Sequence, residues 1–172
     1  PLDHRGGQCQ TLLRARRQIE PEVDPELLYQ PQIEQRAAGR LDLDLAQHPG
    51  EDAANVQLEL AVRALGLQGE VIVPSFTFAA TAQALLWNRL VPVFCDCLPG
   101  TCTLDPADVE RNITPNTGAI CGVSVYGLPP DVDALIEIGR RRNIPVYFDS
   151  AQGLGATYKG QSLGQFGVCE VF

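Results

Sequence analysis

The sequence predicts an α/β fold, a three-layer sandwich in which helices cover both faces of a mostly parallel sheet. From residue 55 onward, short apolar runs alternate with longer helix-like segments. Strands that alternate with helices pair in parallel, and the helices then cover the sheet on both sides. The composition, with 45% hydrophobic and 20% charged residues, is that of a globular chain long enough for one domain.

The expected elements begin with helix 55–65 and the buried strand 70–74. This strand runs through a proline turn into helix 77–88, whose first turn carries Thr77 and Phe78. Further strands are expected at 91–95, 119–125, 145–149 and 168–172, and further helices at 106–112 and 132–142.

Two of these helices have termini that the sequence defines well. Helix 106–112 starts clearly, because Asp105 can cap it and Pro106 fits its first turn. Helix 132–142 ends on the basic run 140–142, which is interpreted as a solvated last turn because the negative end of the helix dipole favours cations. No element is assigned before residue 55, although the alternation at 41–45 is compatible with one short strand. We therefore divide the chain into a divergent or poorly ordered segment, 1–52, and a folded part, 53–172.

Asp149 ends the apolar strand 145–149 and is followed by a turn of small residues. Ligands of open α/β sheets bind at such carboxyl ends. A carboxylate there can pair with the protonated ring nitrogen of a cofactor. It can equally cap the next turn or bond to local amides, and the residue alone leaves both interpretations open.

Phe78 lies at the junction of a strand and a helix, where an aromatic ring can lie flat on a planar cofactor. Taken alone, Phe76 and Phe78 favour core packing, because aromatics beside a strand usually pack against a covering helix. Thr77, taken alone, is most simply the N-cap of the helix.

Together these stretches resemble the DegT/DnrJ/EryC1/StrS family of pyridoxal-phosphate-dependent sugar aminotransferases, over about 58–172. The blocks include EVIVPSFTFAAT at 70–81, YGLPPDVD at 126–133, FDSAQ at 148–152 and GATYKG at 155–160. The resemblance implies that 53–172 is part of the type I aminotransferase large domain, with pyridoxal phosphate as cofactor. It also implies that Phe78 stacks on the pyridine ring, Asp149 pairs with the ring nitrogen and Gln152 hydrogen-bonds the ring hydroxyl.

The chain departs from the family pattern at two places. The family lysine that binds the cofactor covalently is expected beyond Phe172, and Lys159, on a polar turn, is interpreted as an ordinary solvated lysine. The element that binds the cofactor phosphate corresponds to AANVQL at 53–58, which has no Ser or Thr. Asn55 is the candidate there, because it could cap the helix and leave its first amides free for phosphate.

Two functions follow as hypotheses, and whether the chain is an enzyme stays open. In the first, it is part of a longer cytoplasmic, homodimeric enzyme that transfers an amino group from a donor such as glutamate to a nucleotide-linked keto sugar. In the alternative, it is a non-catalytic degenerate homologue or interaction domain. A dehydratase-like relative, with histidine in place of the lysine, is a third possibility.

Charge and composition argue against several other classes. A net charge of −8 disfavours a nucleic-acid partner. No apolar run approaches the roughly 20 residues of a membrane span, and no signal peptide is visible. Cys95, Cys97 and Cys102 lack the spacing of a structural zinc site, so no metal is expected. A chain ending at Phe172 is expected to expose sheet edges and to self-associate.

Overall fold

The computed structural model describes residues 53–172, with side chains from Val56 onward. The segment 1–52, with the possible strand at 41–45, lies outside the described residues. Four helices are present in the described part: α3 (Ala53–Leu65), α4 (Ala79–Trp87), α5 (Pro106–Asn112) and α6 (Val132–Arg142). The strands are β1 (Glu70–Pro74), β2 (Val91–Cys95), β3 (Thr117–Val123), β4 (Val146–Asp149), β5 (Thr157–Tyr158), β6 (Gln161–Ser162) and β7 (Glu170–Val171).

Five of these strands form one sheet in the order β2-β1-β3-β4-β7. Every neighbouring pair in it is parallel, as the alternation of strands and helices predicts. The remaining two strands, β5 and β6, form a separate antiparallel hairpin. All parallel carboxyl ends therefore meet at one edge of the sheet, and this edge is where a site is expected.

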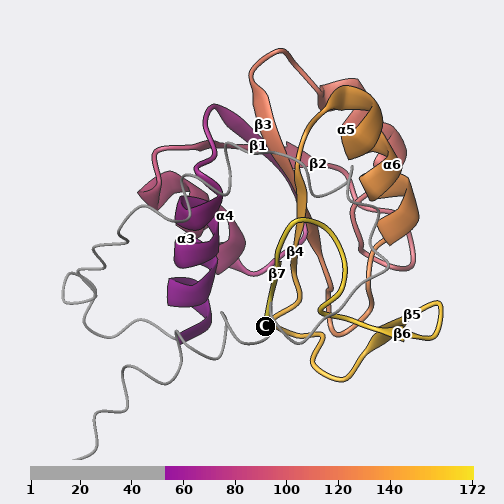
Figure 1. The fold of residues 1–172 in the computed structure, drawn as a ribbon. Helices are drawn as coiled ribbons and strands as arrows, with labels where there is room; N and C mark the ends of the chain where they lie inside the picture. Colours follow the sequence, from indigo (N-terminus) through magenta and orange to yellow (C-terminus); the bar gives the residue numbers. More distant parts are fainter. Residues whose placement is uncertain (1–52) are drawn as a thin grey trace, which may run out of the picture.

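Helices cover both faces of the sheet and complete the three layers (Figure 1). In β1, Val71 and Val73 pack with Val62 of α3 and Leu85 of α4. The intervening Ile72 packs on the opposite face, in the cluster that contains residues of α5 and α6. This alternation follows from the period of two in a strand, and it explains why the strands are apolar throughout. None of the helices in the described part is long and apolar enough to cross a membrane.

Four predicted elements, at 70–74, 91–95, 106–112 and 132–142, have the observed bounds. Others are shifted or shorter: α4 begins at Ala79, for example, and β3 ends at Val123, where the chain goes on into a tight turn. The β5–β6 hairpin was not predicted. Strands of two residues carry no recognisable periodicity, and the turn depends on positive φ angles at Lys159 (49°) and Gly160 (82°).

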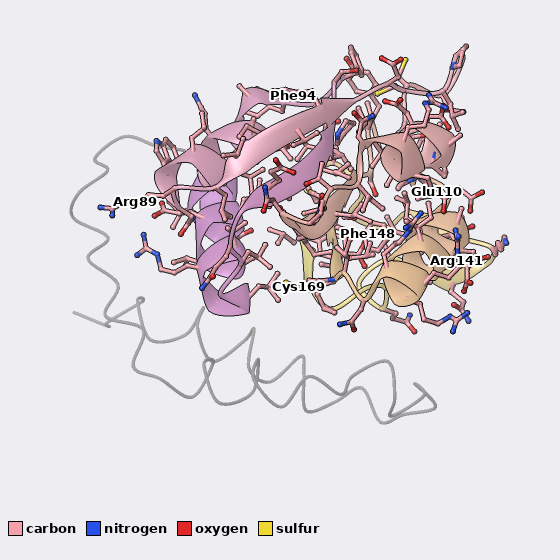
Figure 2. All side chains as sticks on the ribbon, turned by 90° about the horizontal axis from the view of Figure 1, so that it is seen from above. Arg89, Phe94, Glu110, Arg141, Phe148 and Cys169 are labelled. Carbon is pink, nitrogen blue, oxygen red and sulfur yellow. The ribbon has the colours of Figure 1, made fainter. Side chains whose placement is uncertain are left out.

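The basic run at the end of α6 is not merely solvated. Arg140 donates two hydrogen bonds to Glu137, each of 2.9 Å, one turn earlier in the same helix. Arg141 forms an ion pair with Glu110 of α5, and the two side chains lie side by side in Figure 2. All four side chains are exposed to solvent, so each pair contributes little to stability, and only the pair of Arg141 with Glu110 joins the two helices.

Candidate functional site

A cavity of about 440 Å³ opens where β1, β3 and β4 end. Its walls come from the turn after β1, the segment after β3 and the turn after β4, and they include Phe76, Phe78, Tyr126, Asp149 and Gln152. The volume lies within the range that binds small organic ligands. Three of the four predicted cofactor contacts, Phe78, Asp149 and Gln152, are thus brought together from segments up to 74 residues apart.

Asp149 is the last residue of β4 and is only 5% exposed. One carboxylate oxygen accepts a hydrogen bond of 2.7 Å from the Thr81 hydroxyl, and the other accepts one of 3.2 Å from the Ala151 amide. A hydrogen bond to a local amide, one of the two interpretations of Asp149 from the sequence, is therefore present, but it occupies only one carboxylate oxygen. Burial raises the pKa of the Asp149 carboxyl, while the hydrogen bonds from Thr81 and Ala151 act in the opposite direction.

Thr77 does not cap helix α4, contrary to the simplest interpretation of the sequence. The N-cap is Phe78, and its side chain makes no capping bond. The Thr77 hydroxyl lies instead 2.8 Å from the Thr81 hydroxyl. Thr81 has one hydroxyl proton and gives it to Asp149, so Thr77 must be the donor in the pair. The four-residue spacing, which places two residues on one helix face, could have indicated this contact.

Phe78 is 64% exposed and lines the cavity, so its aromatic face is available to a ligand. Phe76 is also exposed, and its ring meets the Tyr126 ring edge to face with centroids 6.3 Å apart. The prediction that Phe76 and Phe78 pack in the core, which the two residues favour when taken alone, is wrong. Both follow the proline that ends β1, and there the chain has left the covered part of the sheet.

Gln152 is oriented by the backbone of a neighbouring turn. Its side-chain oxygen accepts a hydrogen bond of 2.7 Å from the Tyr126 amide, which makes the remaining NH₂ group a donor for a ligand. Tyr126 and Gly127 both have positive φ, at 51° and 81°, and form a two-residue turn between Val125 and Leu128. Tyr126 was not predicted as a site residue, because its place at the cavity depends on this unusual backbone conformation.

A second chain of hydroxyl groups lies beside the cavity. Ser150 donates to Glu170 at 2.6 Å, so Ser124, which is 3.0 Å from Ser150, must donate to Ser150. Ser124 and Ser150 are buried, and the three residues follow or belong to β3, β4 and β7. These bonds connect the ends of three adjacent strands and fix the edge of the sheet on which the cavity lies.

Two further residues named from the sequence lie elsewhere. Asn55 is the third residue of α3, which begins at Ala53, so it does not cap that helix. Its side chain is outside the described ones, and its contact with phosphate stays a prediction. Lys159 is on the β5–β6 turn, away from the described cavity lining, and forms an ion pair with Asp133. It is exposed, as expected of a turn lysine.

The described residues fit a planar pyridine ring. Phe78 offers an apolar face, Asp149 a buried acceptor with lone pairs left over, and Gln152 an NH₂ donor. These are the complements of an aromatic ring, a protonated ring nitrogen and a ring hydroxyl.

Comparison with known proteins points the same way. The model of the DegT/DnrJ/EryC1/StrS aminotransferase family matches residues 52–172. The UDP-N-acetyl-3-dehydro-alpha-D-glucosamine 3-aminotransferase of Acidithiobacillus ferrooxidans is 44% identical over 112 residues, which are 64% of this chain and 30% of that protein. The chain spans about a third of the length of the curated relatives it matches.

Two solved structures are similar in fold. DesI, determined in the presence of its TDP-sugar product, has a TM-score of 0.66 and 38% identity, with 99% of this chain and 42% of that one covered. NtdA from Bacillus subtilis, with bound cofactor PMP, has a TM-score of 0.60 and 36% identity, with 62% and 25% covered.

Proposed function

This chain belongs to the DegT/DnrJ/EryC1/StrS aminotransferase family, and from that premise we propose that it forms the cofactor-binding part of a sugar aminotransferase. The reaction is the transfer of an amino group, from a donor such as glutamate, to a keto sugar carried on a nucleotide. The observation that carries the proposal is the convergence of Phe78, Asp149 and Gln152 on one cavity at the carboxyl edge of the sheet.

Pyridoxal phosphate, when bound, supplies an electron sink that stabilises negative charge at the carbon from which a proton is removed. The residues of this chain supply binding and orientation. Asp149 would accept a hydrogen bond from the ring nitrogen, and its negative charge would keep that nitrogen protonated. Phe78 would pack against the ring face, and Gln152 would donate from its NH₂ group to the ring hydroxyl. The lysine that holds the cofactor covalently is expected outside residues 1–172, because Lys159 lies away from the cavity.

The substrate class rests on the relatives. One is a UDP-linked 3-keto sugar aminotransferase by name, and one structure was determined with a TDP-sugar product. A nucleotide-linked keto sugar is therefore the proposed acceptor. The homodimer that the family resemblance implies and the cytoplasmic location expected from the sequence belong to the same proposal.

The alternative, a non-catalytic homologue, is less well supported. A degenerate chain has no need to keep a buried carboxylate, an exposed aromatic face and an oriented amide on one cavity, because burial of the carboxylate alone costs stability. This chain has all three.

Binding of pyridoxamine phosphate tests the cofactor part of the proposal, because this ligand needs no lysine. We expect Asp149→Asn to weaken its affinity by about tenfold or more, since a hydrogen bond to a charged group contributes about 1.5–3 kcal/mol. Isothermal titration calorimetry measures the change. Asp133→Asn is the matched control, because Asp133 is exposed on α6 and pairs with Lys159 away from the cavity. Equal affinity in the wild type and Asp149→Asn would contradict the proposed role.

The reaction is tested separately in the intact protein. With glutamate and a UDP-linked 3-keto sugar, we expect formation of 2-oxoglutarate and of an amino sugar in equal amounts, both measured by mass spectrometry. Formation of neither product from UDP-, TDP- or GDP-linked keto sugars would refute the proposed substrate class.

A further inference from the structure

The start of helix α4 supplies one residue that lines the cavity and another that binds a residue of its lining. Phe78, its N-cap, presents an exposed ring to the cavity, and Thr81, three residues later, is buried and bonds to Asp149. The two residues are also joined by a backbone hydrogen bond of 3.1 Å from the Thr81 amide to the Phe78 carbonyl. The same turn of helix therefore fixes both the aromatic face and one oxygen of the carboxylate.

The hydroxyl groups of Thr77 and Thr81 form a series that ends on Asp149. Because Thr81 donates to the carboxylate, its own oxygen is free to accept the proton of Thr77. A hydroxyl that accepts one hydrogen bond while it donates another is a stronger donor than an isolated hydroxyl. Thr81 is 1% exposed, so water does not compete readily for its proton.

The carboxylate has acceptor capacity beyond these protein contacts. An ionised carboxylate has about four acceptor positions. The described structure gives Asp149 two donors, Thr81 on one oxygen and the Ala151 amide on the other. The two donors come from different elements, α4 and the turn after β4, and together they fix the rotation of the group about its last bond.

We propose that Thr81, supported by Thr77, is a positioning residue that holds the Asp149 carboxylate in the orientation in which it meets a pyridinium nitrogen. This inference rests on the proposed function, because it takes the pyridine ring as the ligand. Thr81 acts through Asp149 and touches the ring nitrogen at no point. Loss of its hydroxyl leaves the negative charge in place but frees the carboxylate to turn.

The test compares two ligands that differ in one ring atom. Pyridoxamine phosphate has the ring nitrogen, whereas its 1-deaza analogue has carbon there and cannot pair with Asp149. We measure both affinities by calorimetry for the wild type, Thr81→Val and Thr81→Ser in the intact protein. The wild type is expected to prefer the nitrogen ligand by about tenfold or more. Thr81→Val should lose most of this preference through weaker binding of the nitrogen ligand, and Thr81→Ser, which keeps the hydroxyl, should retain it.

A matched control is available in the loop after β2, which does not line the cavity. Thr103 is 3% exposed and its hydroxyl lies 3.0 Å from that of Thr101, in the loop after β2. Thr103→Val removes a buried hydroxyl of the same kind without touching Asp149, and it should keep the full preference. Thr77→Val, which leaves the contact between Thr81 and Asp149 in place, should show a smaller loss and serves if Thr81→Val does not fold.

The outcomes separate this inference from the proposed function. A wild-type protein that binds both ligands equally would refute the pairing of Asp149 with the ring nitrogen, and the inference with it. A wild type that prefers the nitrogen ligand, together with a Thr81→Val variant of the same preference, would refute the positioning role alone. A parallel loss of affinity for both ligands would show that Thr81 only supports the fold. Loss confined to the nitrogen ligand would establish the positioning role.

Discussion

Two of the buried carboxyl groups among the described residues have pKa values that are shifted in opposite directions. Asp149 is 5% exposed and has a raised pKa, because burial outweighs its hydrogen bonds. Asp108 is 8% exposed and has a lowered pKa, first because it accepts a 2.6 Å hydrogen bond from the Asp96 amide and further because it pairs with Arg111 at 2.7 Å. Burial raises the pKa of both carboxyl groups, but at Asp108 the hydrogen bond from the Asp96 amide and the contact with Arg111 outweigh it.

The two aspartates should therefore affect stability oppositely as pH changes. The stabilising contribution of Asp149 is fully present below pH 3.8, the ordinary pKa of an aspartate, and is lost as pH rises through its raised folded pKa. Asp149→Asn should therefore gain stability relative to the wild type as pH rises. The Asp108 contribution is present above pH 3.8 and is lost as pH falls through its lower folded pKa. The deficit of Asp108→Asn should accordingly shrink in acid. Urea unfolding at a series of pH values measures both, and parallel curves would contradict the shifts.

Which site residues the sequence could predict depends on how local their signals are. Asp149 ends a strand and Phe78 lies at a junction of strand and helix, so the strand pattern locates both at the carboxyl edge, whereas Gln152 was predicted only from the family resemblance. Thr81 was not predicted, because its contact with Asp149 joins residues 68 positions apart and periodicity describes near neighbours only. Tyr126 was missed for another reason, since a φ of 51° at a tyrosine has no signature in the sequence.

At the scale of single elements, helix α6 combines well-defined termini with a tight contact at its C-terminal end. Asp131 caps it through a 3.1 Å hydrogen bond from the Ala134 amide, and Asn143 ends it in the left-handed conformation with φ 56°. Near that end, a Cβ at Gly139 would lie 2.4 Å from Val146 Cγ2 and 2.6 Å from the Ile144 carbonyl oxygen. The helix therefore approaches the start of β4 as closely as only glycine allows.

Gly139→Ala should consequently destabilise the protein although alanine is the better helix former. The helix propensity gain is about 1 kcal/mol, whereas overpacking costs about 1–3 kcal/mol and here involves a backbone atom that cannot rotate away. We expect a net loss of up to about 2 kcal/mol in the free energy of unfolding, by the difference of these two effects. Chemical denaturation measures it. A gain in stability would contradict the close approach of α6 to β4.

The elements were predicted well where both ends carry local chemistry and less well where tertiary context sets the boundary. Helix α5 begins where Asp105 and Pro106 place it, and the Asp105 side chain accepts from the Ala107 amide at 2.9 Å. Helix α4, by contrast, starts two residues later than predicted, because the Thr77 hydroxyl bonds to Thr81 rather than to a helix amide. When a side chain has two possible hydrogen-bond partners, the sequence does not show which of them it binds.

At the scale of the whole molecule, the exposed edges of the described sheet are where association with another chain is expected. β2 is one edge strand, and its Val91 and Phe94 are 57% and 55% exposed. Phe94 is labelled on this strand in Figure 2. Exposed apolar side chains on an edge with unpaired backbone groups favour pairing with another chain. The self-association expected from the sequence stays a prediction.

Phe94→Lys should reduce self-association of the 172-residue chain while leaving its thermal unfolding nearly unchanged, because a lysine on an edge strand opposes pairing and the site is half exposed. Sedimentation velocity at several concentrations measures the change. Leu154→Lys is the matched control, since Leu154 is 85% exposed and lies in the turn region after β4 rather than on an edge strand. An equal effect of both substitutions would point to general charge repulsion instead of the β2 edge.

The pairing of Lys159 with Asp133 bears on any covalent labelling of this chain. Lys159 is the one lysine among the 172 residues, so reagents that acylate or alkylate lysine amines would attach to the β5–β6 turn. The hydrogen bond with Asp133 raises the pKa of the lysine, which lowers the fraction of neutral amine that can attack a carbonyl. An aldehyde offered in excess would react slowly, and at the hairpin. A coloured or reduced adduct on this chain would therefore report on the hairpin surface, and peptide mapping is needed before such an adduct is attributed to the cavity.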